Sequence, residues 1–181
     1  MNAHIETNRA KEQAGLQMSS IRDMLAAVNC DYGRLEDLRE ELADLESEAN
    51  DDTNVVSIEA REFLADWHKE NDEELSDMVA AAGDCEGEES ARARIQEDPL
   101  SIQVRSGWYT PGDSDVKPGE FEILLCTGGP AVRIRGDLDD HGQPTRAYLQ
   151  YQDWNTPWTD YYESGAGADL LEYATHFFYG E

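Results

Sequence analysis

Positive charge is scarce in this sequence. The 181 residues include 14 Lys and Arg against 40 Asp and Glu, so the formal net charge at pH 7 is -26. Only three of the cations are lysines. A surface with this much negative charge repels phosphate backbones and anionic lipid headgroups. The composition therefore argues against direct binding to nucleic acid or to a membrane, and it favours a basic protein as the partner.

Cysteine and long apolar runs are scarce as well. Cys30, Cys85 and Cys126 lie far apart and form no CxxC pair, so we expect neither a disulfide framework nor a zinc site. No apolar run approaches the roughly 20 residues that a membrane-spanning helix needs. The first 15 residues lack the apolar centre of a secretory signal. These features lead us to expect a cytoplasmic protein.

No motif for catalysis or for a cofactor is evident. The segment DLDDHG at 137–142 begins like a calcium loop, but its twelfth position is Tyr148, so a polar hairpin turn is the better interpretation. The segment CTGGP lacks the Gly-Lys-Ser of a phosphate loop and predicts a tight turn with positive φ. Cys126 with His141 or His176 would supply a nucleophile and a base, but no local signature supports this pairing. We expect no enzyme, no metal and no cofactor.

The negative charge is distributed unevenly. Residues 1–30 carry three acids and three bases, residues 31–98 carry 24 acids and six bases, and residues 99–181 carry 13 acids and five bases. The middle segment therefore has a net charge of -18. An adaptation to high salt would acidify the whole surface, whereas the first 30 residues are neutral. The position of the charge thus favours a function for the middle segment.

The first half of the chain is typical of helices. Its apolar residues recur at the spacing of a coiled-coil seam, which is interrupted at Asp31, and Gly33 is expected to bend or break the helix there. A turn at 50–54 precedes a second helix that ends near Gly83, so we expect an antiparallel helical hairpin. We also expect the seam to join two copies of the chain in a homodimer. The seam consists of Ile21, Val28, Leu35, Leu38, Leu42 and Leu45.

The second half of the chain predicts an antiparallel sheet. Its segments alternate apolar and polar residues and are separated by turns, and residues 168–180 predict a closing helix. The fold class is therefore α+β, with an acidic helical arm at 1–98 and a sheet with a C-terminal helix at 99–181. The aromatic stretch DWNTPWTDYY is interpreted as core more readily than as an interface. The predicted strands are 101–109, 120–126, 128–138, 146–154 and 158–162.

The most acidic helix has a charge density of the order found in nucleic acid. Residues 35–52 would span roughly 27 Å as a helix and contain nine acids, or about one charge per 3 Å. Two such helices side by side would approach the roughly one charge per 1.7 Å of duplex DNA. A rigid acidic helix of this kind would fit a groove that binds nucleic acid. The nine residues are Glu36, Asp37, Glu40, Glu41, Asp44, Glu46, Glu48, Asp51 and Asp52.

In its size, its charge and its acidic helical face at 31–98, the chain resembles the small acidic anti-defence proteins of phages and plasmids. This class includes DNA-mimicking anti-CRISPR and anti-restriction proteins. The resemblance implies a non-enzymatic inhibitor, in the host cytoplasm, that binds the basic nucleic-acid-binding surface of a defence protein. The sheet at 99–181 is an alternative source of the specific contacts, with the arm steering the approach.

Other functions remain open. The acidic face would also suit the solvated exterior of a coiled coil in a structural or scaffold protein of a phage or complex. A chaperone that binds basic clients in general is another alternative, and an enzyme is the weakest of these interpretations. The scaffold alternative differs in a testable way, because the apolar seam and not the carboxylates would then supply the affinity.

Overall fold

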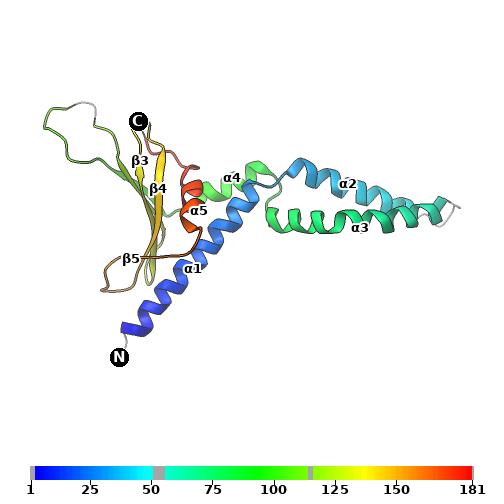
Figure 1. The fold of residues 1–181 in the computed structure, drawn as a ribbon, viewed down its shortest axis with the longest axis horizontal. Coiled ribbons are helices and arrows are strands. Elements are labelled where there is room, and N and C mark those ends of the chain that lie inside the picture. Colours follow the sequence, from blue (N-terminus) through cyan, green and yellow to red (C-terminus); the bar gives the residue numbers. More distant parts are fainter. Residues whose placement is uncertain (1–2, 51–55, 114–115, 181) are drawn as a thin grey trace. The chain divides into compact units, whose positions relative to one another are not determined.

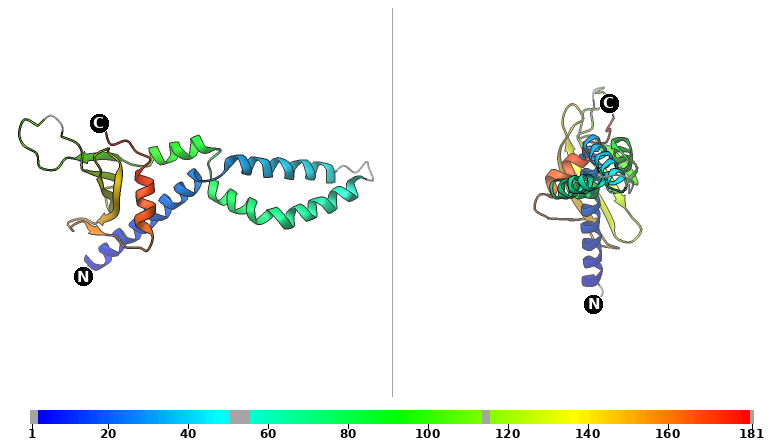
Figure 2. Two further views of the ribbon diagram at one scale, coloured as in Figure 1. Left: turned by 45° about the horizontal axis from the view of Figure 1, so that its top comes forward. Right: turned by 90° about the vertical axis from the view of Figure 1, so that its right-hand side faces the viewer.

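The computed structural model shows the expected α+β fold. The described part of the chain contains five helices and one five-stranded antiparallel sheet (Figure 1). Figure 2 shows the same ribbon from two further directions. The residues that the structure describes are 3–50, 56–113 and 116–180.

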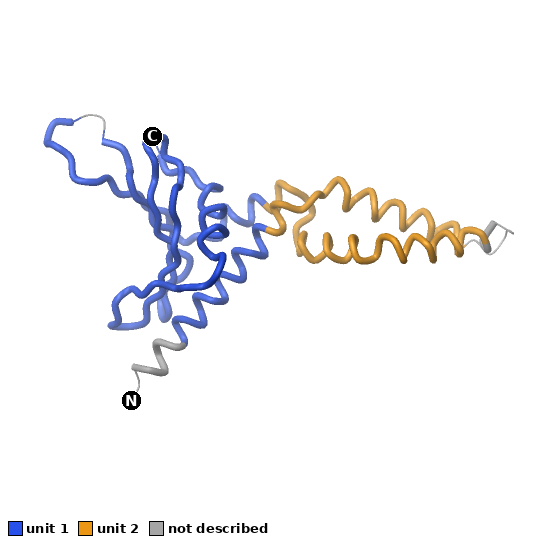
Figure 3. The backbone as a smooth tube through the Cα atoms, viewed as in Figure 1, with its two compact units in different colours: residues 1–25, 92–181 blue, residues 26–91 orange. Residues whose placement is uncertain are grey.

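The compact units of the chain differ from the expected division between residues 98 and 99. Unit 1 comprises residues 1–25 and 92–181, and unit 2 comprises residues 26–91 (Figure 3). The first 25 residues belong with the sheet because helix α1 (Ala3–Val28) makes ion pairs within unit 1. Its Arg22 side chain lies 2.5 Å from a Glu163 carboxylate oxygen and 2.8 Å from one of Asp169. Unit 1 is therefore interrupted in sequence by unit 2.

The five predicted strands are confirmed, with bounds that differ by a few residues. The sheet has the strand order β1-β2-β3-β4-β5, so each strand pairs with its neighbours in sequence. The connections between β2 and β5 are four to six residues long, whereas the β1–β2 loop spans residues 106–119. Antiparallel neighbours need no crossover helix between them, which suits this meander. The strands are β1 (Ser101–Arg105), β2 (Glu120–Cys126), β3 (Ala131–Leu138), β4 (Pro144–Gln152) and β5 (Thr159–Asp160).

One face of the sheet forms the core of unit 1. The alternating apolar residues of the central strands point to this face, where Phe121, Ile134 and Leu149 are almost completely buried. Helix α5 (Ala166–Ala174) lies against β4. Its buried Tyr173 hydroxyl donates a 2.6 Å hydrogen bond to Asp98. Burial, with the nearby Asp98 carboxylate, raises the pKa of this phenol, so it remains a donor at neutral pH.

The other face of the sheet carries a ladder of paired charges. Arg133 lies 2.6 Å from Glu122, and its guanidinium carbon is 3.9 Å from the ring centroid of Trp158. Arg135 lies 2.6 Å from Glu120 in the same way. Burial lowers the pKa of Arg133, whereas the adjacent Glu122 opposes this shift. The face is thus filled by pairs of charges instead of a second apolar layer.

Unit 2 is built around a helical hairpin. Helices α2 (Tyr32–Ala49) and α3 (Val56–Ala82) lie side by side in all views (Figures 1 and 2). Helix α3 ends where predicted, because Gly83 follows it with a φ of 57°, a conformation that glycine adopts easily. The predicted turn at 50–54 falls mostly outside the described residues. Helix α4 (Glu88–Glu97) continues from unit 2 into unit 1.

The break between α1 and α2 has a cause other than the predicted one. Residues 29–31 separate the helices, and Gly33 lies inside α2. The Asp31 side chain accepts a 3.0 Å hydrogen bond from the backbone N–H of Arg34 and so caps the N-terminus of α2. The capping carboxylate, and not the flexibility of glycine, therefore marks the start of the second helix.

Gly136→Ala is expected to destabilise unit 1 strongly. A Cβ atom at this position would lie 1.9 Å from the carbonyl oxygen of Arg146 and 2.5 Å from the Phe121 ring. Overpacking in a core costs roughly 1–3 kcal/mol, and a backbone clash places this variant at or beyond the upper end. Urea unfolding measures the change. Gly129→Ala is the matched control, because nothing lies within 4 Å of its Cβ. Equal stability of the two variants would contradict this packing.

Candidate partner-binding surface

The helical hairpin of unit 2 is held together by a narrow apolar seam. Leu35 and Leu38 of α2 are at most 1% exposed. Further along the hairpin, Leu42 and Leu45 are only partly buried. Two helices alone cannot enclose a wide apolar stripe, so part of the stripe stays in contact with solvent. The seam is therefore tightly packed at Leu35 and Leu38, looser at Leu42 and Leu45, and buried again at Ala49.

Scarce cations link the two helices. The Arg34 guanidinium makes two hydrogen bonds to the Glu74 carboxylate, at 3.0 and 3.1 Å. These bonds raise the pKa of Arg34 and lower the pKa of Glu74. Arg61 of α3 donates to the carbonyl oxygen of Ala49, at the C-terminal end of α2, where a cation is favourable. These arginines thus serve the hairpin itself.

The predicted acidic face of α2 is exposed to solvent. Among its members that the structure describes, only Glu41 makes a cross-helix bond, a 3.2 Å hydrogen bond that it accepts from the Trp67 indole. Asp51 and Asp52 lie outside the described residues. The seven described members are all exposed: Glu36, Asp37, Glu40, Glu41, Asp44, Glu46 and Glu48.

Helix α3 carries a row of acids on its own exposed face. The sequence interpretation did not single out these residues, although their recurrence every three or four positions is the spacing of one helical face. Like charges at this spacing repel one another, so the row lowers the stability of the helix. A function of the row, or strong solvation of its carboxylates, would account for its presence. The exposed members are Glu62, Asp66, Glu70, Glu73 and Asp77.

The predicted dimer seam is divided by the helix break. Ile21 and Val28 belong to α1, whereas the four leucines belong to α2. Ile21, like Leu35 and Leu38, is almost completely buried within a single chain. Val28, Leu42 and Leu45 are partly buried. Half of the predicted seam is therefore already used by the protomer, and the homodimer through the arm stays a prediction.

A groove of about 530 Å³ lies beside the N-terminal half of α2. Glu36, Glu40 and Glu86 line it together with Arg39 and the apolar Leu35. Three carboxylates against one guanidinium give the groove a net negative charge, and the exposed Ala43 offers contact to an aliphatic stem. A lysine or arginine side chain of a partner is the chemistry that fits this groove.

Cys126 and His141, one of the two pairs considered for catalysis, lie at opposite ends of a strand pair. Cys126 ends β2 opposite Val132, whereas His141 lies in the turn that follows β3, at the other end of this strand pair. A seven-residue strand spans roughly 20 Å, so Cys126 and His141 are far beyond hydrogen-bond reach. Burial raises the pKa of the Cys126 thiol and lowers the pKa of His176. Cys126 is thus a weak nucleophile at neutral pH.

The two suspected loop motifs are turns, as predicted. Asp139 Oδ1 accepts hydrogen bonds from the backbone N–H groups of His141 and Gln143, at 2.8 and 2.9 Å. These bonds lower the pKa of Asp139 and fix the hairpin turn between β3 and β4. Gly128 has a φ of 101°, as the tight turn after β2 requires. In the part of the chain that the structure describes, no group of three His, Cys, Asp or Glu side chains is arranged to hold a metal ion.

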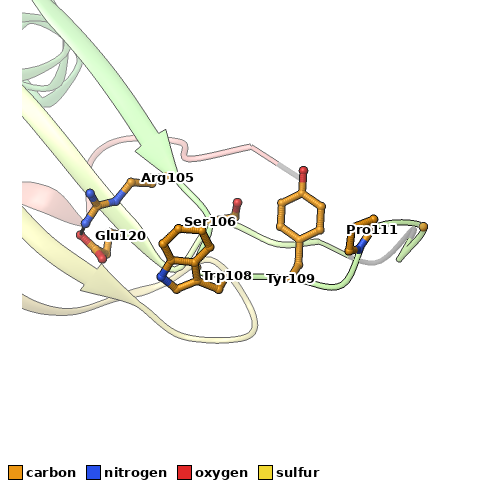
Figure 4. A pocket seen from close by; sticks show the side chains of 8 residues that line it. Arg105, Ser106, Trp108, Tyr109, Pro111 and Glu120 are labelled. Carbon is orange, nitrogen blue, oxygen red and sulfur yellow. Dashed lines mark hydrogen bonds and ion pairs between the residues drawn. The ribbon is translucent and has the colours of Figure 1, made fainter.

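A concavity of about 890 Å³ borders the loop between β1 and β2 (Figure 4). Trp108 is fully exposed and Tyr109 is 60% exposed on this loop. The Arg105 side chain beside them is paired with Glu120. Trp108 and Tyr109 thus give the concavity the character of an exposed aromatic surface.

The aromatic stretch near the end of the chain is not core. Trp154 is 65% exposed and Tyr162 is 84% exposed, so the core interpretation of this stretch is wrong for both residues. Trp158 packs over Arg133 on the charged face of the sheet. The reason is that α5 already fills the core face of β4, which leaves these rings to the other face and to the adjacent turn.

Comparisons with known proteins give no relative. No family model matches the chain, and neither the curated proteins nor the solved structures contain a match. A search of the described residues for a helix long and apolar enough to cross a lipid bilayer found none.

We expect the Arg34–Glu74 contact to stabilise the hairpin by an amount that depends on pH. Because Arg34 lowers the pKa of Glu74, the contact stabilises the hairpin above the ordinary glutamate value of 4.5, and this stabilisation is lost as the pH falls through the lower folded-state pKa. A double-mutant cycle with Arg34→Met and Glu74→Gln measures it as a coupling free energy of unfolding. Because the cycle subtracts the effects of the two single variants, the general effect on stability of neutralising an acid cancels. A coupling near zero at pH 7, or one that persists at pH 2, would contradict the contact.

Proposed function

We propose that the chain is a non-enzymatic inhibitor that binds the basic, nucleic-acid-binding surface of a host defence protein. A CRISPR effector or a restriction enzyme in the host cytoplasm is the expected target, and acidic mimicry of DNA is the expected mechanism. The observation that carries the proposal is the exposed double row of carboxylates on α2 and α3. Residues 26–91 contain 22 acids and four bases, a net charge of -18.

The charge density of the hairpin supports mimicry of a nucleic acid strand. Helices α2 and α3 together contain 15 acids and four bases. The 27 residues of α3 span roughly 40 Å, which gives about one net charge per 3.7 Å. DNA carries about one charge per 3.4 Å on each strand and one per 1.7 Å as a duplex. A single hairpin therefore approaches the density of one strand, and two hairpins together would approach that of a duplex.

Such a surface gains binding energy in the way that DNA does. Lysines and arginines of the target exchange their counterions for carboxylates, so the affinity falls as the salt concentration rises. The cross-helix arginines keep the carboxylates at fixed positions, which reduces the ordering cost on binding. The groove at Glu36 and Glu40 supplies a place for one basic side chain of the target.

A coiled-coil scaffold is the second candidate, and a specific observation favours it. Phe63 and Val79 of α3 are 68% and 41% exposed, and they leave apolar surface on the hairpin. Further helices could pack there in a larger assembly. In that case the carboxylates are solvated, neither DNA nor salt weakens the assembly, and Phe63→Lys abolishes it.

Charge reversal on α2 should separate these functions. Glu36, Glu40 and Asp44 lie one helical turn apart, are exposed, and leave the Glu41–Trp67 bond intact. Replacing the three with Lys should preserve helicity, since Glu and Lys have similar helix propensity. We expect it to weaken binding to the target roughly a hundredfold, because charge pairs at interfaces are worth more than exposed ones. The measurement is DNA cleavage by purified CRISPR effectors and restriction enzymes with increasing amounts of the protein.

The matched control places the same change of charge on unit 1. Asp23, Asp113 and Asp140 are exposed there, and their replacement with Lys should leave inhibition within a few-fold of wild type. Wild-type binding to the inhibited enzyme should weaken with salt and with competing duplex DNA. Inhibition that survives the α2 reversal, or that both triple variants lose equally, would show that this hairpin face is not the binding surface.

A further inference from the structure

Strand β1 is an open edge of the sheet. It pairs with β2 on one side, and no described strand pairs with its other side. Four of its five residues are exposed. The backbone groups that point away from β2 are therefore available to another strand, which is the usual hazard of a sheet edge.

The apolar core face of the sheet extends onto β1 without a cover. Ile102 lies opposite Ile123, and Val104 lies opposite Phe121. The two residues on β2 are at most 1% exposed, whereas Ile102 is 37% and Val104 is 44% exposed. Tyr179 packs against the Phe121 ring at a centroid distance of 4.8 Å, so the cover reaches β2. One strand further, the same face is left in contact with water.

The apolar surface continues past both ends of β1. Leu100 precedes the strand and is 60% exposed, and Trp108 follows it and is fully exposed. Trp108 lies close to the Arg105 end of the strand (Figure 4). Proteins usually protect an edge with proline, a bulge or an inward-pointing charge. Ser101–Arg105 contains no proline, and its two core-face residues are apolar.

We propose that β1 pairs with β1 of a second copy, antiparallel and about a two-fold axis at Gln103. This register places Ile102 opposite Val104 of the second copy, and the reverse, so the two apolar pairs extend the core face across the axis. Gln103 lies opposite its own equivalent. Arg105 lies opposite Ser101 of the second copy, so like charges do not face one another. The result is one continuous ten-stranded sheet with an isologous interface.

The distribution of charge favours a second copy at this edge. Two chains of net charge -26 repel each other, and their contact needs a region without acids. Residues 99–112 contain no Asp or Glu, and Arg105 is their one charged residue. A parallel pairing in register would place the two Arg105 side chains next to each other. The antiparallel pairing avoids this repulsion.

Sedimentation equilibrium over about 1–100 μM tests the pairing, because a short interface is expected to associate in the micromolar range. Wild type should dimerise. Higher salt should strengthen the dimer because it screens the net charge, whereas higher salt should weaken binding to the target. Val104→Lys should weaken the dimer roughly tenfold or more, because it places a charge in the new apolar pair. Leu16→Lys is the control, since Leu16 is 66% exposed on α1 of the same unit.

Two further measurements exclude misfolding of the variant and dimerisation through the helical arm as causes of the result. Amide hydrogen exchange should show concentration-dependent protection of β1 in wild type, and unchanged protection of β3 and β4 in Val104→Lys. The double variant Leu42→Asp/Leu45→Asp should still dimerise. A monomeric wild type at 100 μM, or a dimer that Val104→Lys leaves intact, overturns the proposal. A dimer that is lost in the Leu42/Leu45 variant and kept in Val104→Lys also overturns it.

Discussion

Repulsion among the carboxylates of residues 26–91 is the constraint on which the rest of unit 2 depends. With 22 acids and four bases, an isolated pair of helices would separate unless short-range contacts opposed the field. Leu35 and Leu38 provide the apolar part of that opposition. Arg34 and Arg61 provide the polar part, by joining α2 to α3 at two points. The same few contacts hold the charges at fixed spacing, which is what a basic partner would recognise.

Unit 1 is subject to a different constraint, because one face of its sheet must be covered and the other must be solvated. The core face is covered as far as β2 by α5, whose Tyr173 is anchored to Asp98, and by Tyr179 on Phe121. On the second face, Arg133 and Arg135 form ion pairs with glutamates on the neighbouring strand, so these charges cancel. Charge is therefore used for internal pairing in unit 1 and for external display in unit 2, and this contrast supports a binding role for the hairpin.

Periodicity predicted most elements of the fold, because it reports which side of an element faces the core. The alternation of Phe121 with Glu120 and of Ile134 with Arg133 predicted both strands and their faces. Position-specific features were harder. The Arg22 contacts join residues more than 140 positions apart, and no local pattern encodes them. Trp154 and Tyr162 are apolar enough for a core, but α5 had already filled it. In the candidate site, charge density alone predicted the acids of α2. The row of acids on α3 could have been found only by comparing its helical spacing with that of α2.

The arrangement of unit 1 in two sequence segments has a consequence for biosynthesis. Its first 25 residues leave the ribosome before the hairpin, but Glu163 and Asp169, the partners of Arg22, emerge only after it. The hairpin between them depends on contacts within 40 positions or fewer along the chain, so it is able to form while the nascent α1 still lacks its partners. The hairpin is thus an insertion within the sequence of unit 1. Its length can change by whole helical turns during evolution without altering a single residue of the sheet.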